Sequence, residues 1–226
     1  MKENESLSEK ESLNIINEMI QKTKATYHDK GISALLWGTV VTIASLVSFA
    51  RIEFDFQLGF DIWLIVLFAI IPQVFISIQE KRKIKIRKHD DEAIDAVWIV
   101  YAITIFGLVA YQNIIPNATS NILNSEGWQL LKHYNNGIKP DEIIKPFAPS
   151  FSSIFILIYA FPTFITGLVK KFKPMIIGGI ISYAAFIVSL YTETKYDMLL
   201  CALAAICNWL IPGFILRRRY LKKLAC

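Results

Sequence analysis

Residues 196–216 read YDMLLCALAAICNWLIPGFIL, and this stretch decides the fold class. A helix needs about 20 largely apolar residues to cross about 30 Å of hydrocarbon. The stretch has that length, and its middle third carries no charged side chain, the costliest kind to place at the membrane centre. It also lacks the polar–apolar alternation of a membrane β-strand. The segment therefore predicts a transmembrane helix.

Five more segments share this pattern: residues 32–50, 60–79, 95–115, 151–169 and 175–192. The composition agrees, because 54% of the 226 residues are hydrophobic and 19% are charged, whereas soluble domains average about 45–50% and about 25%. We predict an all-α fold, a polytopic membrane helix bundle whose six transmembrane helices form one domain over residues 32–216. An ordinary soluble domain, a disordered chain and a secreted disulfide scaffold are excluded.

Basic residues are concentrated on one side of the predicted bundle. Of the 24 lysines and arginines, 19 fall in the amino-terminal segment, in the connections at 80–94 and 170–174, and in a basic tail at 217–226. Because positively charged loops stay in the cytoplasm, we predict that both termini are cytoplasmic.

Residues 1–31 form a polar segment with a helical pattern. Ser8 and Glu11 have the spacing of a capping box. Apolar residues then recur near one face: Leu13, Ile16, Ile20 and Tyr27. We predict a cytoplasmic amphipathic helix that covers the mouth of the bundle, lies on the membrane or docks another protein.

Each helix that returns toward the cytoplasm contains a proline: Pro72, Pro162 or Pro212. Proline has no N–H, so it leaves the carbonyl four residues earlier without its helical partner. We predict helix kinks at these three positions. The freed carbonyls either line a cavity or are bonded by neighbouring Ser and Thr side chains.

Gln73 and Asn208 are the most notable polar residues at membrane depth. A carboxamide in hydrocarbon needs partners, and hydrogen bonds between helices are one way of providing them. The other is a polar cavity that accepts a neutral solute. Both readings stay open at this level.

Small residues four apart indicate close helix packing. The pairs are Ala34/Gly38, Gly178/Ser182 and Cys201/Ala205. They support a compact bundle.

Residues 116–150 form the longest predicted connection, on the outer side. The apolar residues in it fit a short surface helix: Trp128, Leu130, Leu131 and Tyr134. Because loops longer than about 12–15 residues are often functional, a lid over a cavity is one reading and a passive cap is the other.

The sequence contains no enzyme signature. Metalloprotease, serine hydrolase, P-loop and dinucleotide motifs are absent. The three histidines lie outside the predicted spans: His28, His89 and His133. Acidic residues lie at span ends, where a charge is tolerated: Asp61, Asp95 and Asp197. We predict no catalytic residue, no cofactor and no metal site.

The basic run at residues 81–88 is interpreted as the flank of a membrane span with no specific ligand. Contact with anionic headgroups, or with nucleic acid, is the alternative. Asp90, Asp91 and Glu92 follow at once and would repel a nucleic-acid phosphate. The lipid bilayer is therefore an expected partner, and nucleic acid is not.

Two runs in the carboxy-terminal third are distinctive. Residues 162–167 read PTFITG and lead into KFKP at 171–174, and residues 209–217 read WLIPGFILR. With Leu36-Trp37-Gly38 at the start of the first span, these runs resemble small six-span inner-membrane proteins of Bacteroidetes-type bacteria. The resemblance implies a bacterial inner-membrane location and topology. It implies no catalytic residue, since that family has no assigned activity.

We therefore expect a non-enzymatic inner-membrane protein that works as a sensor, regulator or accessory subunit through a protein partner or as a homo-oligomer. The contact would be made by the cytoplasmic parts at residues 1–31, 80–94 and 217–226. The alternative is a small permease for a neutral or lipid-like solute, built around Gln73 and Asn208.

Overall fold

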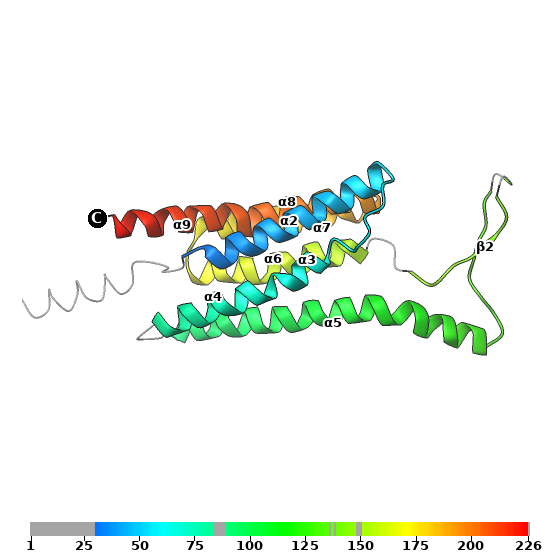
Figure 1. Ribbon diagram of the computed structural model, residues 1–226, viewed down its shortest axis with the longest axis horizontal. Coiled ribbons are helices and arrows are strands. Elements are labelled where there is room, and N and C mark those ends of the chain that lie inside the picture. Colours follow the sequence, from blue (N-terminus) through cyan, green and yellow to red (C-terminus); the bar gives the residue numbers. More distant parts are fainter. Residues whose placement is uncertain (1–29, 84–88, 136, 138, 148–150, 226) are drawn as a thin grey trace, which may run out of the picture.

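The computed structural model describes residues 30–83, 89–135, 137, 139–147 and 151–225. These residues are helical apart from connecting loops and one two-stranded hairpin (Figure 1). The helices are α2 (Ile32–Glu53), α3 (Leu64–Phe68), α4 (Ile70–Lys83), α5 (His89–Ser125), α6 (Phe151–Val169), α7 (Lys173–Ser189), α8 (Thr194–Ala205), the π-helical turn η1 (Ile206–Leu210) and α9 (Ile211–Leu224). The strands β1 (Leu131–Lys132) and β2 (Glu142–Ile143) pair antiparallel. The amino-terminal helix predicted within residues 1–31 lies almost wholly outside the described residues.

Four helices are long and apolar enough to cross a membrane: Ile32–Glu53, Asp90–Ser125, Phe151–Val169 and Thr194–Lys222. The last of these runs through α8, η1 and α9 without a loop. Two shorter apolar helices, Leu64–Glu80 and Lys173–Ser189, complete the set. The prediction of an all-α fold with several apolar membrane-length helices is confirmed. Two of the six predicted spans are shorter than expected, because residues 54–63 form a loop before α3 and because α7 ends at Ser189.

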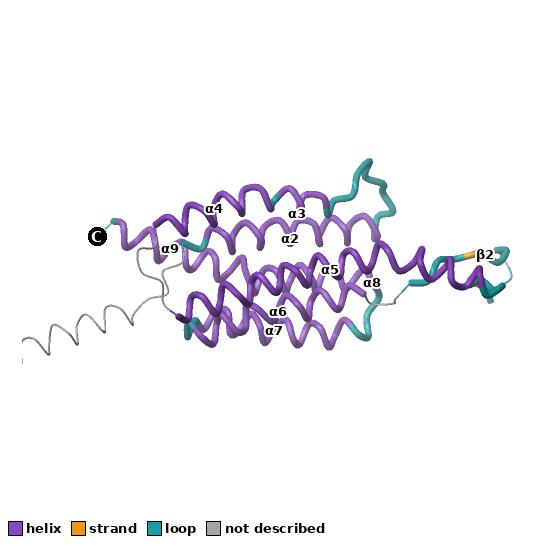
Figure 2. The backbone as a smooth tube through the Cα atoms, turned by 90° about the horizontal axis from the view of Figure 1, so that it is seen from below, coloured by secondary structure: helices purple, strands orange, loops and turns teal. Residues whose placement is uncertain are grey.

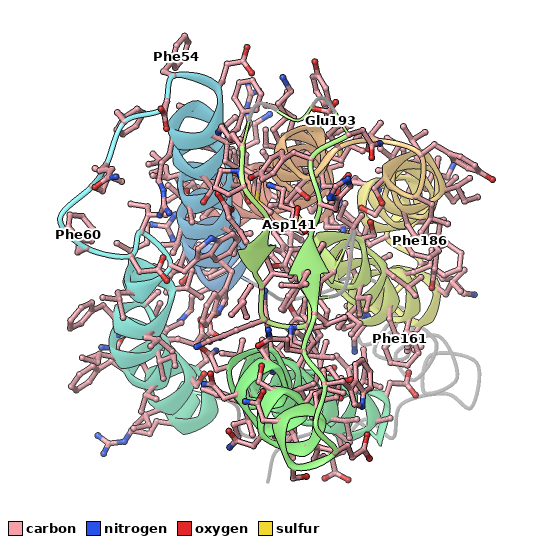
Figure 3. All side chains as sticks on the ribbon, turned by 90° about the vertical axis from the view of Figure 1, so that its right-hand side faces the viewer. Phe54, Phe60, Asp141, Phe161, Phe186 and Glu193 are labelled. Atoms are coloured by element: carbon pink, nitrogen blue, oxygen red, sulfur yellow. The ribbon has the colours of Figure 1, made fainter. Side chains whose placement is uncertain are left out.

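The tightly packed part of the bundle consists of α2, α6, α7 and the continuous helix α8–η1–α9. Figure 3 looks along these helices and shows α2, α8, α7 and α6 grouped together. They share one core of buried side chains: Val41, Ile156, Tyr159, Ala185, Cys201, Ala204, Ala205 and Trp209. The basic residues that were predicted to start a separate tail continue α9 as far as Leu224.

Glycines allow the backbones in this core to come unusually close. A Cβ atom on Gly178 of α7 would lie 2.2 Å from the carbonyl oxygen of Cys207. One on Gly38 of α2 would lie 2.6 Å from the backbone nitrogen of Leu210. Both glycines belong to the small-residue pairs of the sequence, and both lie against the turn η1.

Helices α3, α4 and α5 are peripheral. Helix α5 packs mainly on α6 and touches η1 through Tyr101, whose ring lies edge-on to Trp209 with centroids 6.4 Å apart, while α4 packs on α2 and α3. Only 6% of the apolar 18-residue stretch of α5 is buried inside the protein. In a bilayer, such faces are covered by acyl chains or by another protein.

Helix α5 extends beyond the rest of the bundle. The ring of Tyr111 stacks on Phe151, the first residue of α6, with centroids 6.3 Å apart. Residues 112–125 therefore project past α6, over about 21 Å at about 1.5 Å per residue. Figures 1 and 2 show this projection with β2 at its end.

This projection corrects the expected outer loop at 116–150. The helix continues through Pro116 to Ser125, because a proline inside a helix removes a single N–H donor and here does not end it. The segment around Trp128 and Leu131 contains a strand in place of the expected short helix. Lys145 donates a hydrogen bond to Asn117 Oδ1 at 2.7 Å, which joins the returning chain to α5.

We predict that Gly178→Ala lowers the free energy of unfolding by about 1–3 kcal/mol, because the added methyl group overpacks the contact with η1. Gly107→Ala is the matched control, since a Cβ at Gly107 meets nothing within 4 Å. It should change stability by less than about 1 kcal/mol. Unfolding of both variants in mild detergent checks this, and an equal loss in the two would contradict the packing described.

Candidate functional site

The bundle interior contains a set of buried polar side chains. All of them lie on α2, α6, α7, α8 and η1: Thr42, Ser45, Ser152, Ser153, Thr163, Thr166, Ser182, Ser189, Asp197 and Asn208. Polar groups enclosed by protein in a membrane bundle need partners, and they commonly mark functional positions. Two groups of contacts involve them, around Asn208 and around Asp197, and a further group of half-buried polar side chains lies on α2 and α4.

The first group surrounds Asn208 in the turn η1. Pro212 has no N–H to bond the Asn208 carbonyl, and the helix widens just before it, so that the N–H of Ile211 bonds the carbonyl of Ile206. Asn208 is fully buried, and its Nδ2 donates to Ser182 Oγ at 2.7 Å. Within the described part of the chain, its Oδ1 has no hydrogen-bond partner.

Two tryptophans bond to threonines of α6 beside this turn. Trp209 Nε1 donates to Thr163 Oγ1 at 3.0 Å, and Trp98 Nε1 donates to Thr166 Oγ1 at 3.2 Å. The ring of Trp209 also packs on Tyr159, with centroids 5.0 Å apart. These bonds attach α5 and η1 to α6, and the sequence did not reveal the pairing.

Gln73 belongs to a second group, on α2 and α4. Its Oε1 accepts from Trp37 Nε1 at 3.0 Å, and its Nε2 donates to Ser33 Oγ and Ser77 Oγ, both at 3.1 Å. Gln73 is half-buried and bonded through both ends of its amide. The structure therefore does not bring Gln73 and Asn208 together, since Gln73 bonds to α2 and α4 while Asn208 bonds to α7.

The three prolines differ in their surroundings. Helix α3 ends at Phe68 and α4 begins at Ile70, so the helix is interrupted just before Pro72. The π-turn η1 ends two residues before Pro212. Helix α6 continues through Pro162, and Thr166 Oγ1 donates to the Pro162 carbonyl at 2.7 Å.

The third group is centred on Asp197, in the first turn of α8. Its side chain is fully buried. Ser152 Oγ donates to Oδ2 at 2.8 Å, and Thr192 Oγ1 donates to Oδ1 at 2.8 Å. The sequence placed Asp197 at a span end and gave no sign of burial, because the residues that enclose it come from α6 and from the α7–α8 turn.

Within the described ranges, no cluster of three His, Cys, Asp or Glu residues is placed to hold a metal ion. Cys201 and Cys207 are both free thiols. Asp197 is thus the most unusual chemical group in the bundle interior.

Comparison with known protein families, with curated proteins and with solved structures found no match. The resemblance to six-span inner-membrane proteins therefore stays an expectation.

We predict that Ser182→Ala lowers the free energy of unfolding by about 1–3 kcal/mol, because it leaves the buried Asn208 Nδ2 without an acceptor. Adding Asn208→Leu should restore part of this loss, since both polar groups are then absent. Ser125→Ala, at an exposed serine, should have little effect. Equilibrium unfolding of the set in mild detergent checks this. Additive losses in the double variant would contradict the pairing.

Proposed function

We propose that the chain is a six-span protein of the bacterial inner membrane, with both termini in the cytoplasm, that has no enzymatic activity and works through a protein partner. Its apolar helices support residence in a bilayer. The role of sensor, regulator or accessory subunit follows from the absence of catalytic motifs in the sequence together with the surfaces described below.

The distribution of charge supports the orientation. The start of α2, the turn between α6 and α7, and α9 lie at one end of the bundle (Figure 1). This end carries Lys30, Lys170, Lys171, Lys173, Arg217, Arg218 and Arg219. At the opposite end, Lys195 pairs with Glu53 at 3.1 Å. Positive charge concentrated at the end where α2 starts and α9 ends favours a cytoplasmic position for that end.

The projecting part of α5 and its hairpin carry the proposal of a partner. We call residues 112–135 and 139–147 the outer arm. Apolar side chains on it are exposed: Ile114, Ile122, Trp128, Leu131, Ile143 and Phe147. Acyl chains can cover the exposed faces of α4 and of the part of α5 that lies alongside α6, but the outer arm extends past the bundle. Exposed apolar patches beyond the lipid are typical of protein contacts.

Of the cytoplasmic surfaces expected to bind a partner, residues 1–29, 84–88 and 226 lie outside the described residues. The outer arm therefore adds a second contact region, on the opposite side of the membrane. A partner that reaches both regions would be a membrane protein or a second copy of this chain.

The permease alternative has one observation in its favour. Asn208 Oδ1 is buried and, among the residues that the structure describes, lacks a partner, so a small hydrogen-bonding solute has a group to bind. Gln73, its proposed companion, is fully bonded elsewhere. The partner function is therefore the better supported of the two.

We predict that a membrane-impermeant maleimide labels Ser125→Cys in intact cells and labels Lys222→Cys only after the membrane is permeabilised. Both positions are exposed. A Cys226→Ser background leaves Cys201, which is buried, and Cys207, which is half-buried in the middle of the apolar helix α8–η1–α9. Labelling of Lys222→Cys in intact cells would contradict the proposed orientation.

We predict that a photoreactive benzoylphenylalanine at Ile122 of the outer arm forms a crosslink to a protein in living cells. Ile180 of α7 is the matched control, because both side chains are 56% exposed but Ile180 lies on a membrane-embedded helix. Mass spectrometry of the adduct identifies the partner or shows a second copy. An absence of adducts from Ile122, or the same adducts from Ile180, would contradict a contact at the outer arm.

A further inference from the structure

The carboxylate of Asp197 is enclosed without a cationic partner. No Lys, Arg or His nitrogen among the described residues lies within 4 Å of it. Lys195, two residues earlier, is directed elsewhere, with its Nζ 3.1 Å from Glu53 and 3.9 Å from Glu193. Since Asp197 is fully buried by protein alone, water does not surround its charge.

A buried charge is strongly unfavourable unless it is paired and hydrogen-bonded. Hydroxyl groups of Ser152 and Thr192 each supply one hydrogen bond to Asp197. The amino-terminal end of α8 adds a favourable dipole, because Asp197 lies in its first turn. These contacts come from neutral hydroxyls and a partial dipole, so no cationic group of the described residues faces the carboxylate.

More hydroxyl oxygens lie at the same level of the bundle. Ser153 is 1% exposed, and its Oγ has no hydrogen-bond partner in the described part of the protein. Helices α6 and α7 run antiparallel, and Gly179 packs on Phe164. Continuing this register places Ser153 level with the end of α7, where Ser189 is fully buried. Ser153 thus follows Ser152 directly on α6 and lies at about the level of the α7–α8 turn, which leads into Asp197.

We propose that Asp197, Ser152, Ser153 and Thr192 form a binding site for a monovalent alkali-metal cation at the outer end of the bundle. Oxygen atoms of carboxylates and hydroxyls are the ligands that hard cations prefer. One carboxylate neutralises one positive charge, whereas a divalent ion would leave a net charge inside the bundle. The unbonded Ser153 hydroxyl supplies a ligand that the hydrogen-bond network does not use.

The α7–α8 turn provides the approach to this site. Thr192 is half-buried, and its neighbours Tyr191 and Glu193 are exposed. Figure 3 labels Glu193 beside the start of α8, at the end of the bundle that faces the viewer. Its carboxylate would attract cations from the outer side. This inference does not rest on the proposed partner function.

Thermal unfolding of the purified full chain in mild detergent tests the site, with intrinsic tryptophan fluorescence as the readout. The protein is titrated with NaCl or KCl, and choline chloride keeps the ionic strength constant. We expect Na⁺ or K⁺ to raise the Tm saturably, since a ligand that binds only the folded state stabilises it. Asp197→Asn should abolish the shift. Asp55→Asn, at an exposed aspartate in the left-handed region that Asn also adopts, should retain it.

Ser153→Ala gives an independent test that changes one small side chain. It should raise the cation concentration at half of the Tm shift by about tenfold, which corresponds to the loss of one good contact. Equal Tm values in choline, Na⁺ and K⁺ would overturn the proposal. So would a shift that persists in Asp197→Asn. If Asp197→Asn fails to fold, an unchanged half-saturating concentration in Ser153→Ala would overturn it.

Discussion

The contact between α7 and the π-helical turn η1 is the constraint on which the rest of the bundle depends. A Cβ atom on Gly178 would come within 2.2 Å of the Cys207 carbonyl oxygen, so the two backbones meet only because glycine has no side chain. This closeness lets Asn208 Nδ2 reach Ser182 Oγ at 2.7 Å. Gly38 places α2 against the same turn. Two helices, α2 and α7, thereby pack against one irregular turn. The turn departs from regular α-helix because Pro212 has no backbone N–H to donate.

A core of this kind suits a protein surrounded by lipid. Lipid tails are as apolar as the side chains, so close van der Waals packing and hydrogen bonds between helices hold a bundle together. The packed helices have small residues and buried hydroxyls, whereas α4 and α5 have large exposed apolar side chains such as Phe75 and Ile103. The same molecule therefore has a closely packed centre and a periphery of exposed apolar side chains. Among the described residues, the one buried carboxylate, that of Asp197, lies in the first turn of α8 at an end of this packed centre.

Much of the fold could be predicted from the sequence, because the length and apolar content of a membrane helix are local properties. The small-residue pairs containing Gly38 and Gly178 also indicated close packing correctly. The rest depends on contacts between distant segments. Burial of Asp197 requires Ser152, 45 residues away, and the separation of Gln73 from Asn208 depends on which helices pack together. The continuation of α5 through Pro116 was missed because proline in a sequence more often indicates a helix end.

The central claim is that α7 and the turn η1 meet backbone to backbone. Solid-state NMR of the uniformly ¹³C- and ¹⁵N-labelled chain in lipid bilayers measures this contact directly. The structure predicts a through-space cross-peak between the Cα atoms of Gly178 and Asn208, because a Cβ on Gly178 would be 3.2 Å from Asn208 Cα. The contact between Gly167 of α6 and Met175 of α7 serves as the internal reference. A spectrum that shows the reference cross-peak but none between Gly178 and Asn208 would contradict this account.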